Sequence, residues 1–458
     1  MHPTAVLDVV GLTPALLGDD TPHLNRLARD GAQAALRAIT PAVTCAAQAT
    51  LLTGTLPRQH GIVGNGWYFR DLAQVMFWRQ SNRLVHGEQV WEAARRRDAA
   101  CTCAQMFWWF NMYSSADWAV TPRPIYPADG RKIPDIYTQP AALRERLTAE
   151  LGAFPLFHFW GPQADIRSSR WIAEAAMCVD RWYSPTLLLV YLPHLDYGLQ
   201  RLGPSDARVR ADVRAIDELC GRLIAHCRER GRRVIVLSEY GLVDVEGPVH
   251  VNRALRGAGL LAVRTELGGE LLDAGASDAF AVADHQIAHI YVRRPAAIPD
   301  VRAIVEHLPG VDAVLDRREQ AALGLDHERS GELVALSQAN RWFTYYYWLD
   351  DARAPDFART VDIHRKPGYD PAELLIDPAL RAPKLTVAAA LIRKTLGFRY
   401  LLEVVPLDAS LVRGSHGRVT DRLAEGPILI SSERALVPDA VVESTGVRDL
   451  MLAHLFET

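Results

Sequence analysis

The chain is poor in cysteine. Its 458 residues include 6 cysteines, and only Cys101 and Cys103 are closely spaced. So few cysteines without a repeated spacing exclude a disulfide framework and a zinc knuckle, and reduced thiols are expected. The N-terminal stretch MHPTAVLDVVGL also lacks the basic segment and long apolar core of a secretory signal. We therefore expect a cytoplasmic protein.

Long apolar runs and a surplus of positive charge are missing too. No apolar segment reaches the length needed to cross a membrane, so no membrane partner is expected. The formal net charge of -3 leaves no basic excess for a nucleic-acid polymer. With 49% hydrophobic and 23% charged residues, the chain can bury a large core, as two domains or as one domain with a substantial insertion.

The apolar residues that are present predict an α/β fold. Short, uniformly apolar runs are typical of buried parallel strands, and helix-like stretches at residues 21–33 and 205–230 lie near or between them. These runs are TAVLDVVG, TLLLVYLP, RRVIVLS and PILIS. We predict a mostly parallel central sheet flanked by helices.

Residues 249–360 have a different character and predict a smaller α+β insertion, or cap. Within it we predict a strand at residues 280–294, a helix followed by a strand at 300–315, and a strand at 341–351. Residues 1–248 and 361–458 would then form the core.

Polar residues follow three of the predicted core strands. Asp8 lies in VLDVVGL, Asp196 follows TLLLVYLP, and Glu239 and Tyr240 follow RRVIVLS. Ligands gather where parallel strands end, and a buried carboxylate there costs several kcal/mol unless it is paired, hydrogen-bonded or bound to a cation. One such residue could be a helix cap or part of an ion pair. Three at one sheet edge favour a shared cation.

Thr44 allows two interpretations. It stands in PAVTCAAQATLLTG, where a threonine before a helix is most often a cap. It could instead be a nucleophile at the start of that helix. This stretch alone does not decide between them.

The order and spacing of several motifs resemble the type I phosphodiesterase and nucleotide pyrophosphatase branch of the alkaline phosphatase superfamily. The motifs are VLDVVGL, TPHLNRLARDG, VTCAAQATLLTG, RQHGIVGNGWY, DYGLQRLGP, SEYG and GSHGR. The resemblance implies an alkaline phosphatase-like core with two divalent metal ions. It also implies that Thr44 attacks phosphorus and becomes transiently phosphorylated or nucleotidylated.

The resemblance assigns a role to each matching residue. The ligands of one metal would be Asp8, Thr44, Glu239 and Tyr240. Those of the other would be Asp196, Gln200 and His416. Asn65 would hold a phosphoryl oxygen.

Three positions depart from the family pattern. Glu239 stands where the family has aspartate, which keeps the charge and adds a methylene. Gln200 and Tyr240 stand where the family has histidine, and these two losses of an imidazole leave an oxygen-rich ligand set. Such a set suits Mg²⁺, Mn²⁺, Ca²⁺ or iron better than zinc. Other histidines could fill in; among His194, His285, His289 and His364, we rank His364 first.

The expected function is metal-dependent hydrolysis of phosphodiester, pyrophosphate or phosphonate bonds in a small phosphorylated substrate. One alternative is a phosphoryl mutase or transferase. Another is a degenerate, non-catalytic member that binds a phosphorylated ligand. The sequence specifies neither the substrate nor the oligomeric state.

Overall fold

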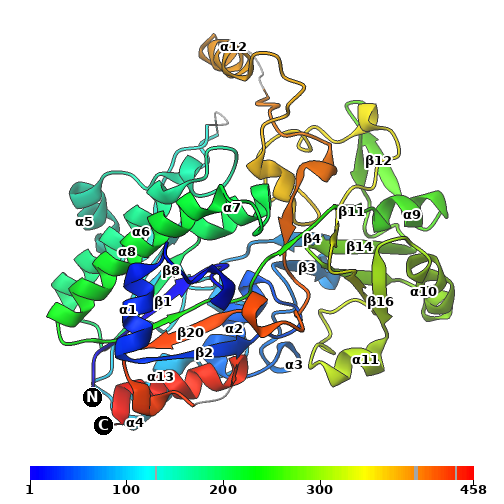
Figure 1. Cartoon of the computed structure of the whole chain (residues 1–458). Helices are drawn as coiled ribbons and strands as arrows, with labels where there is room; N and C mark the ends of the chain where they lie inside the picture. The colour runs from blue at the N-terminus through cyan, green and yellow to red at the C-terminus, as the bar shows by residue number, and fades with distance from the viewer. Residues whose placement is uncertain (129–130, 397–400, 439–440, 458) are drawn as a thin grey trace.

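The largest unit of the protein is a nine-stranded sheet with helices on both faces (Figure 1). The computed structural model describes residues 1–128, 131–396, 401–438 and 441–457. The strand order is β21-β2-β20-β9-β1-β8-β5-β6-β7. The strands are β1 (Thr4–Val9), β2 (Ala32–Arg37), β5 (Cys103–Met106), β6 (Trp118–Pro122), β7 (Ile136–Gln139), β8 (Leu187–Leu192), β9 (Arg233–Leu237), β20 (Ile428–Ser431) and β21 (Val442–Glu443). The predicted α/β class is confirmed.

All four apolar runs form strands of this sheet, but one runs in the other direction. β1 is parallel to both β8 and β9. β20 is antiparallel to both β9 and β2, so its prediction as a parallel strand is wrong. The chain enters β20 near the end of β9, with Leu429 opposite Leu237, and therefore runs back along that strand.

Two groups of helices cover the sheet. α1 (Pro22–Asp30), α6 (Ile166–Tyr183) and α8 (Val209–Glu229) pack together on one face, and α1 and α8 confirm the two predicted helices. α2 (Thr44–Thr53) and α4 (Val90–Arg97) pack against α13 (Val447–Phe456) on the other face (Figure 1).

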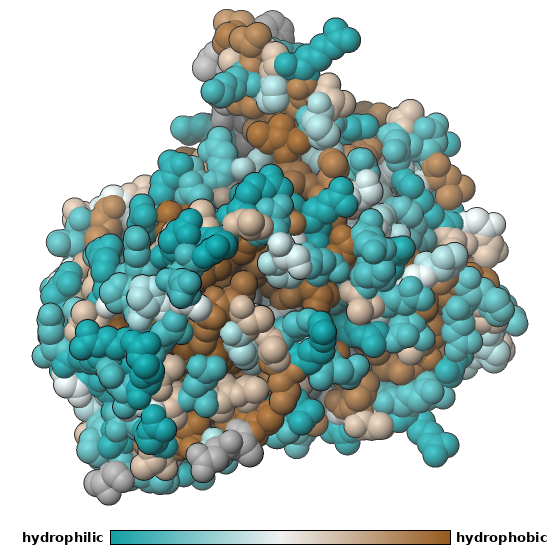
Figure 2. Space-filling model, in the orientation of Figure 1, coloured by the Kyte–Doolittle hydropathy of each residue, from teal (hydrophilic) through white to brown (hydrophobic). Residues whose placement is uncertain are grey.

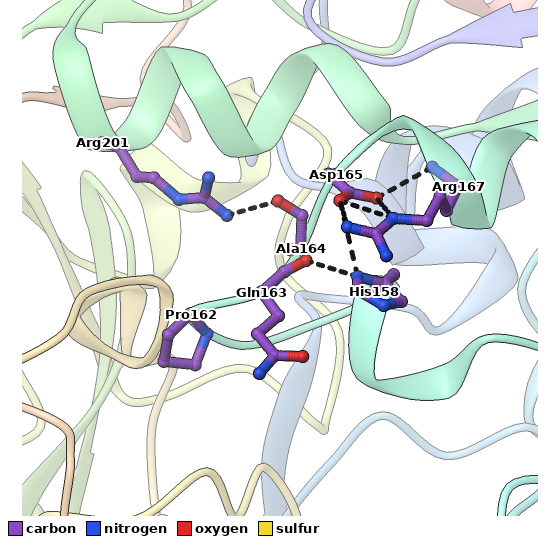
Figure 3. A pocket seen from close by; sticks show the side chains of 7 residues that line it. All are labelled: His158, Pro162, Gln163, Ala164, Asp165, Arg167 and Arg201. Atoms are coloured by element: carbon purple, nitrogen blue, oxygen red, sulfur yellow. Dashed lines mark hydrogen bonds and ion pairs between the residues drawn. The ribbon is translucent and has the colours of Figure 1, made fainter. Parts of the chain in front are cut away.

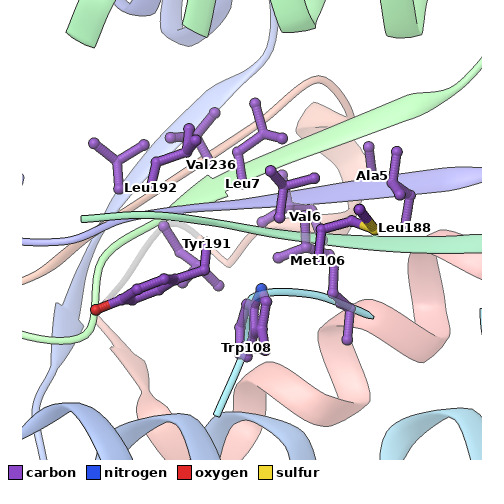
Figure 4. Packing of buried hydrophobic residues seen from close by; sticks show 14 of the residues in the cluster. Ala5, Val6, Leu7, Met106, Trp108, Leu188, Tyr191, Leu192 and Val236 are labelled. Carbon is purple, nitrogen blue, oxygen red and sulfur yellow. The ribbon is translucent and has the colours of Figure 1, made fainter. Parts of the chain in front are cut away.

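The centre of the sheet is buried on both sides, which explains the uniformly apolar strands. Val6, Leu188 and Val236 lie on three adjacent strands, and each is at most 1% exposed. Met106 and Trp108 join the same cluster (Figure 4). Full burial of each such aliphatic side chain contributes about 1.5–3 kcal/mol to folding, so this layer fixes the strand ends firmly.

A second, four-stranded sheet lies within residues 249–360. Its order is β14-β15-β17-β16, formed by Ala279–Asp284, Ile287–Val292, Leu333–Ser337 and Val311–Leu315. The predicted strand at 280–294 is instead a hairpin, because the chain reverses at His285 and Gln286. α9 (Val251–Gly257) and α10 (Ile298–Glu306) pack together beside it.

The predicted strand at 341–351 is also shorter than expected. Only Arg341–Phe343 (β18) is a strand, paired with β11 (Gly247–Val249). The following Tyr345–Trp348 run is buried in the core of the insertion without strand pairing. Its aromatic residues pack against one another, and a run of buried aromatic residues has the same sequence pattern as a buried strand.

The remaining helices and strands connect these units. They are α3 (Pro57–His60), β3 (Gly66–Phe69), β4 (Gln74–Phe77), α5 (Ala142–Leu151), α7 (His194–Leu202), β10 (Val243–Asp244), β12 (Val263–Glu266), β13 (Gly269–Leu272), α11 (Arg317–Ala322), α12 (Pro383–Thr395) and β19 (Gly414–Ser415).

Hydrophilic side chains are spread over the visible face of the molecule, with smaller apolar areas between them (Figure 2). Within the described ranges, none of the helices combines the length and apolarity needed to span a bilayer. All six cysteines are buried free thiols.

Candidate active site

The ends of three neighbouring strands bring the predicted acidic residues to one sheet edge. Asp8 lies near the end of β1, Asp196 in the first turn of α7 after β8, and Glu239 two residues after β9. Because β1 lies between β8 and β9 and runs parallel to both, these positions meet at the same edge. Each of the three residues is at most 7% exposed.

Thr44 is the first residue of α2 and not its cap. Val43 occupies the N-cap position and makes no side-chain cap hydrogen bond. The Thr44 hydroxyl oxygen lies 3.0 Å from the phenol oxygen of Tyr240, and Thr44 is 4% exposed. The structure therefore points the hydroxyl into the cluster at the sheet edge. The backbone N–H groups of the first turn of α2 add partial positive charge there.

Asp8 and Glu239 are joined by a residue that the sequence analysis missed. The Gln48 amide Nε2 donates to Asp8 Oδ2 at 3.3 Å and also to Glu239 Oε1. Gln48 Oε1 accepts from the backbone N–H of Trp109 at 2.7 Å, which fixes the orientation of the amide. One oxygen of each carboxylate, Asp8 Oδ1 and Glu239 Oε2, is left buried without a hydrogen-bond partner.

These carboxyl groups are costly to ionise in this environment. Burial raises the pKa of Asp8 to about 7, against the opposing hydrogen bonds from Glu239 and Gln48. The pKa of Glu239 is raised by burial and then by the neighbouring Asp8 charge. Two buried acids that share the Gln48 amide, each with one unpartnered oxygen, form a pair that a cation would stabilise.

Asp196 and His416 form a second pair. The His416 Nε2 atom lies 4.0 Å from Asp196 Oδ1, which is buried without a hydrogen-bond partner. His416 Nδ1 lies 2.8 Å from the Ala42 carbonyl oxygen, so this nitrogen carries the proton and Nε2 keeps its lone pair. Burial lowers the pKa of His416 to about 3 and raises that of Asp196 to about 7.

Gln200 contacts this second pair through its amide nitrogen. Gln200 Nε2 donates to Asp196 Oδ2 at 2.6 Å, and Gln200 Oε1 accepts from the Tyr369 hydroxyl at 3.0 Å. Both ends of the carboxamide are therefore engaged by the protein. Its oxygen, the atom that would bind a metal, faces Tyr369.

Asn65 lies at the same site and bridges two parts of the chain. Its Oδ1 accepts from the backbone N–H of Cys45, next to Thr44, at 3.0 Å. Its Nδ2 donates to Asp284 Oδ1 at 3.0 Å. An amide nitrogen has two N–H groups, so one remains for a ligand.

Four rings form a continuous stack across the site. Tyr240 stacks on His416 with ring centroids 3.6 Å apart, His416 lies 3.6 Å from His285, and His285 lies 3.7 Å from Tyr369. His285 comes from the tip of the β14–β15 hairpin, so the stack joins the insertion to the core. Burial and then His416 hold the pKa of His285 well below its usual value.

The other candidate histidines lie elsewhere. Burial, followed by Arg79 and Lys132, lowers the pKa of His364, so cations surround it more closely than the acids at the sheet edge. His289 Nε2 contacts the Val63 carbonyl oxygen at 2.8 Å, and His194 Nε2 lies 3.3 Å from Asp212 Oδ1. His416 is thus the imidazole at the sheet edge, with His285 stacked behind it.

The chemistry of the donors fits an oxygen-bound cation only in part. In the part of the chain that the structure describes, no group of three or more His, Cys, Asp or Glu side chains is arranged to hold a metal ion. Asp8 and Glu239 form one pair, whereas Asp196 is paired with the imidazole of His416. The pair Asp8 and Glu239 fits best, because it offers two unpartnered oxygens and the Thr44 hydroxyl is among the groups that hydrogen-bond to Glu239.

A surface hollow of about 550 Å³ lies outside this site (Figure 3). Arg201, which lines it, donates to the Ala164 carbonyl oxygen, whereas the preceding Gln200 donates to Asp196. None of the residues that line the hollow belongs to the candidate site.

Sequence reasoning missed three residues that complete the site: Gln48, Asp284 and Tyr369. Gln48 follows Thr44 by four residues, a helical spacing that places both on one face of α2, and this signal was available. Asp284 and Tyr369 reach the site only through the folding of the insertion and the loop after it. No local pattern marks them.

Comparison with known proteins gives a family match and a set of similar structures. A sequence model described as Type I phosphodiesterase / nucleotide pyrophosphatase matches residues 4–370. No curated protein matches the chain.

Two similar solved structures, each with a bound ligand, illustrate the likeness. Phosphonoacetate hydrolase from Sinorhizobium meliloti 1021, in complex with phosphonoacetate, is 14% identical with a TM-score of 0.64; the alignment covers 99% of this chain and 96% of that one. Inactive murine ectonucleotide pyrophosphatase / phosphodiesterase 5, in complex with AMP, is 14% identical with a TM-score of 0.56, covering 99% and 95%. At this identity, the likeness establishes the fold.

Proposed function

The chain belongs to the type I phosphodiesterase / nucleotide pyrophosphatase family of hydrolytic enzymes, and we propose that it cleaves phosphodiester, pyrophosphate or phosphonate bonds through Thr44. One observation carries this proposal. The Thr44 hydroxyl stands at the N-terminus of α2, 3.0 Å from the Tyr240 hydroxyl and beside buried carboxylates with unpartnered oxygens.

In the first half-reaction, the Thr44 oxygen bonds to phosphorus while the bond from phosphorus to the leaving group breaks. In its ionised form Glu239 is placed to accept the hydroxyl proton, because Thr44 hydrogen-bonds to its carboxyl, and burial, which raises the pKa of that carboxyl, makes the ionised form a strong base. Tyr240 stays protonated, since burial and nearby acids hold its pKa well above the usual value, and its O–H can donate to the attacking oxygen.

Asn65 and α2 stabilise the transferred group. The second N–H of the Asn65 amide is available to an equatorial phosphoryl oxygen, where negative charge accumulates. The N-terminal N–H groups of α2 face the same group with partial positive charge. In the second half-reaction, water attacks the phosphorus bound to Thr44 and restores the hydroxyl.

We propose two divalent ions of unequal affinity as cofactors, with Mn²⁺, Mg²⁺, iron, Ca²⁺ or Zn²⁺ as candidates. Asp8, Glu239, Thr44 and Tyr240 would hold the tighter one, and Asp196 and His416 with Gln200 the weaker one. When bound, such ions lower the pKa of a coordinated hydroxyl and neutralise charge on the phosphoryl oxygens and the leaving group.

Replacement of the nucleophile tests this proposal. Thr44→Ala should reduce hydrolysis of bis(p-nitrophenyl) phosphate to background, and mass spectrometry of the wild-type protein quenched during turnover should find phosphate or its ester on Thr44. Thr53→Ala, in the same helix but bonded to the Ala49 carbonyl, is the matched control and should retain activity. Full activity of Thr44→Ala would overturn the proposal.

A second candidate is a non-catalytic member that binds a phosphorylated ligand. The absence of a three-ligand acidic or histidine cluster among the described residues favours it. Elemental analysis after incubation with Mn²⁺, Mg²⁺, iron and zinc separates the two, since the hydrolase requires stoichiometric metal.

The substrate is proposed to be small and phosphorylated. The two ligand-bound structures suggest a first screen of phosphonates and nucleotides alongside aryl phosphate mono- and diesters. We also propose a cytoplasmic location, which six free buried thiols fit.

A further inference from the structure

Asp284 belongs to the insertion, yet it contacts the core residue Asn65 with both carboxylate oxygens. Oδ2 accepts from the Asn65 backbone N–H at 2.7 Å, and Oδ1 accepts from the Asn65 side-chain amide at 3.0 Å. Asp284 is 1% exposed, and Asn65 is 2% exposed. A bidentate contact of this kind fixes both the position and the rotation of the amide.

The hairpin tip that carries Asp284 is itself held from three sides. The Tyr369 N–H donates to the Ala283 carbonyl at 2.9 Å, and the Phe343 N–H donates to the His285 carbonyl at 2.7 Å. The Gln286 N–H donates to the His416 carbonyl at 2.8 Å. His285 adopts a φ of 61°, in the left-handed region, which turns the chain at the tip. The backbone from which the Asp284 side chain extends is therefore held in place.

The Asp284 carboxylate is packed closely against the segment that carries Asn65. A Cβ atom on Gly64, the residue before Asn65, would lie 3.1 Å from Asp284 Oδ2. The carboxylate therefore lies directly against the backbone that presents Asn65. On the other side of Asn65, its oxygen accepts from Cys45 N–H at the start of α2.

We propose that Asp284 is a positioning residue through which the insertion aims the Asn65 amide at the phosphoryl group. The chain of contacts runs from Asp284 to Asn65 to the N–H of Cys45, beside Thr44. Asp284 accepts one of the two amide N–H groups, and this leaves the other in a defined direction for a phosphoryl oxygen. This inference rests on the proposed function, because it assigns Asn65 to phosphoryl binding.

A double-mutant cycle on Asp284 and Asn65 tests the inference. Affinity for inorganic phosphate is measured by titration calorimetry, with Mn²⁺ present, for the wild type, Asp284→Asn, Asn65→Ala and the double variant. Asp284→Asn keeps the shape but presents an NH₂ group to a donor. It should weaken phosphate binding about tenfold, and in the Asn65→Ala background it should have almost no further effect.

The cycle also separates positioning from a general loss of stability. Asp217→Asn is the matched control: this carboxylate on α8 is 1% exposed and accepts from the backbone N–H groups of His23 and Leu24 on α1 at 3.1 and 2.9 Å, so it holds backbone of another helix and no residue of the site. It should lower the melting temperature without changing phosphate affinity. If Asp284→Asn does not fold, Asp284→Ser, which keeps one acceptor in less space, takes its place in the cycle.

Two outcomes would overturn the inference: an unchanged phosphate affinity in Asp284→Asn, or a loss that persists in full when Asn65 is already alanine. A wild-type protein that binds no phosphate would overturn it as well. A wild-type protein that binds phosphate, shows the expected cycle and hydrolyses no ester would overturn only the hydrolytic proposal.

Discussion

The hydroxyl groups of Thr44 and Tyr240 face each other at 3.0 Å, in a site where neither residue is more than 4% exposed. The phenol belongs to the loop after β9, and the threonine opens α2. Two segments almost two hundred residues apart in the sequence thus meet at the proposed nucleophile. The two hydroxyl groups form a hydrogen-bonded pair that a substitution of Tyr240 can separate while keeping its ring.

Tyr240→Phe should lower kcat by about 10²–10³-fold, because it removes the donor placed at the attacking oxygen. The ring, and with it the stack on His416, is kept. Tyr346→Phe is a matched control, since the Tyr346 hydroxyl is buried without a hydrogen-bond partner, and it should leave kcat unchanged. Steady-state kinetics on an aryl phosphodiester measure both. Equal activity of Tyr240→Phe and the wild type would remove Tyr240 from the mechanism.

Gln48→Glu should make the protein more dependent on a cation. It replaces the amide between Asp8 and Glu239 by a third carboxylate, so mutual repulsion lowers the melting temperature in EDTA. A divalent cation relieves this repulsion, and the melting temperature should rise by several degrees more than that of the wild type on adding Mn²⁺.

Thermal unfolding with and without metal checks the Gln48 prediction. Gln320→Glu provides the comparison, because Gln320 is equally buried but contacts the backbone carbonyls of the insertion. It should be destabilised to the same extent in both conditions. A Gln48→Glu protein that gains no more from Mn²⁺ than the wild type would argue against a cation between Asp8 and Glu239.

Gln200→His should strengthen the second metal site. In the wild type, the Gln200 oxygen accepts from Tyr369, which leaves two ligands: Asp196 Oδ1, which has no hydrogen-bond partner, and His416 Nε2, which lies 4.0 Å from it. A histidine four residues after Asp196 on α7 faces the same side of the helix and supplies a third ligand. The affinity for the second ion should rise at least tenfold, or about 1.4 kcal/mol.

Calorimetric titration with Zn²⁺ or Mn²⁺, together with elemental analysis, measures this change. Gln200→Leu removes the carboxamide without adding a ligand and should not tighten the site. If the wild type already binds two ions with equal affinity, the assignment of a weak second site is incorrect.

His60 predicts a pH dependence of stability that a variant can isolate. Burial is the main cause that lowers its pKa to about 3 in the folded protein, against about 6.5 in an unfolded chain. As the pH falls below 6.5, the unfolded chain takes up a proton and the folded protein does not. The contribution of His60 is therefore present above pH 6.5 and is lost toward pH 3, at about 1.4 kcal/mol per pH unit.

In the wild type, His60 Nδ1 accepts a hydrogen bond from the Ile62 N–H at 3.0 Å. His60→Asn removes the titrating group and keeps an acceptor for this N–H. The variant should be less stable than the wild type at pH 7, because the contact with Thr50 is lost. The difference should shrink as the pH falls from 6.5 to 4. Urea unfolding at several pH values gives the two curves, and curves that stay parallel would contradict the assignment.

The sequence was sufficient to predict the sheet and the acids at its edge. Strands buried on both faces leave uniformly apolar runs, and the polar residue that follows each run then stands out, as Asp8, Asp196 and Glu239 do. The fold class is confirmed by the sheet, and the resemblance drawn from the ordered motifs is confirmed by the family match. The role of each site residue stays a prediction.

What the sequence did not predict depends on the orientation of side chains and on distant segments. The direction of β20 depends on where the chain re-enters the sheet, and its apolar letters are the same either way. Gln200 offers an oxygen and a nitrogen, and only the positions of Asp196 and Tyr369 decide which one faces the acid. The sequence ranked His364 above His285, but His285 lies on a hairpin tip that reaches His416.

The stack that runs from Tyr240 through His416 and His285 to Tyr369 joins the core and the insertion along one side of the site. Withdrawal of the hairpin would unstack His285 and release Asn65 from Asp284 in a single movement. The movement that admits a substrate would then also disrupt the arrangement of the catalytic residues. An enzyme built in this way would be inactive while the hairpin is withdrawn, so water that enters the open site would meet an incomplete set of catalytic residues.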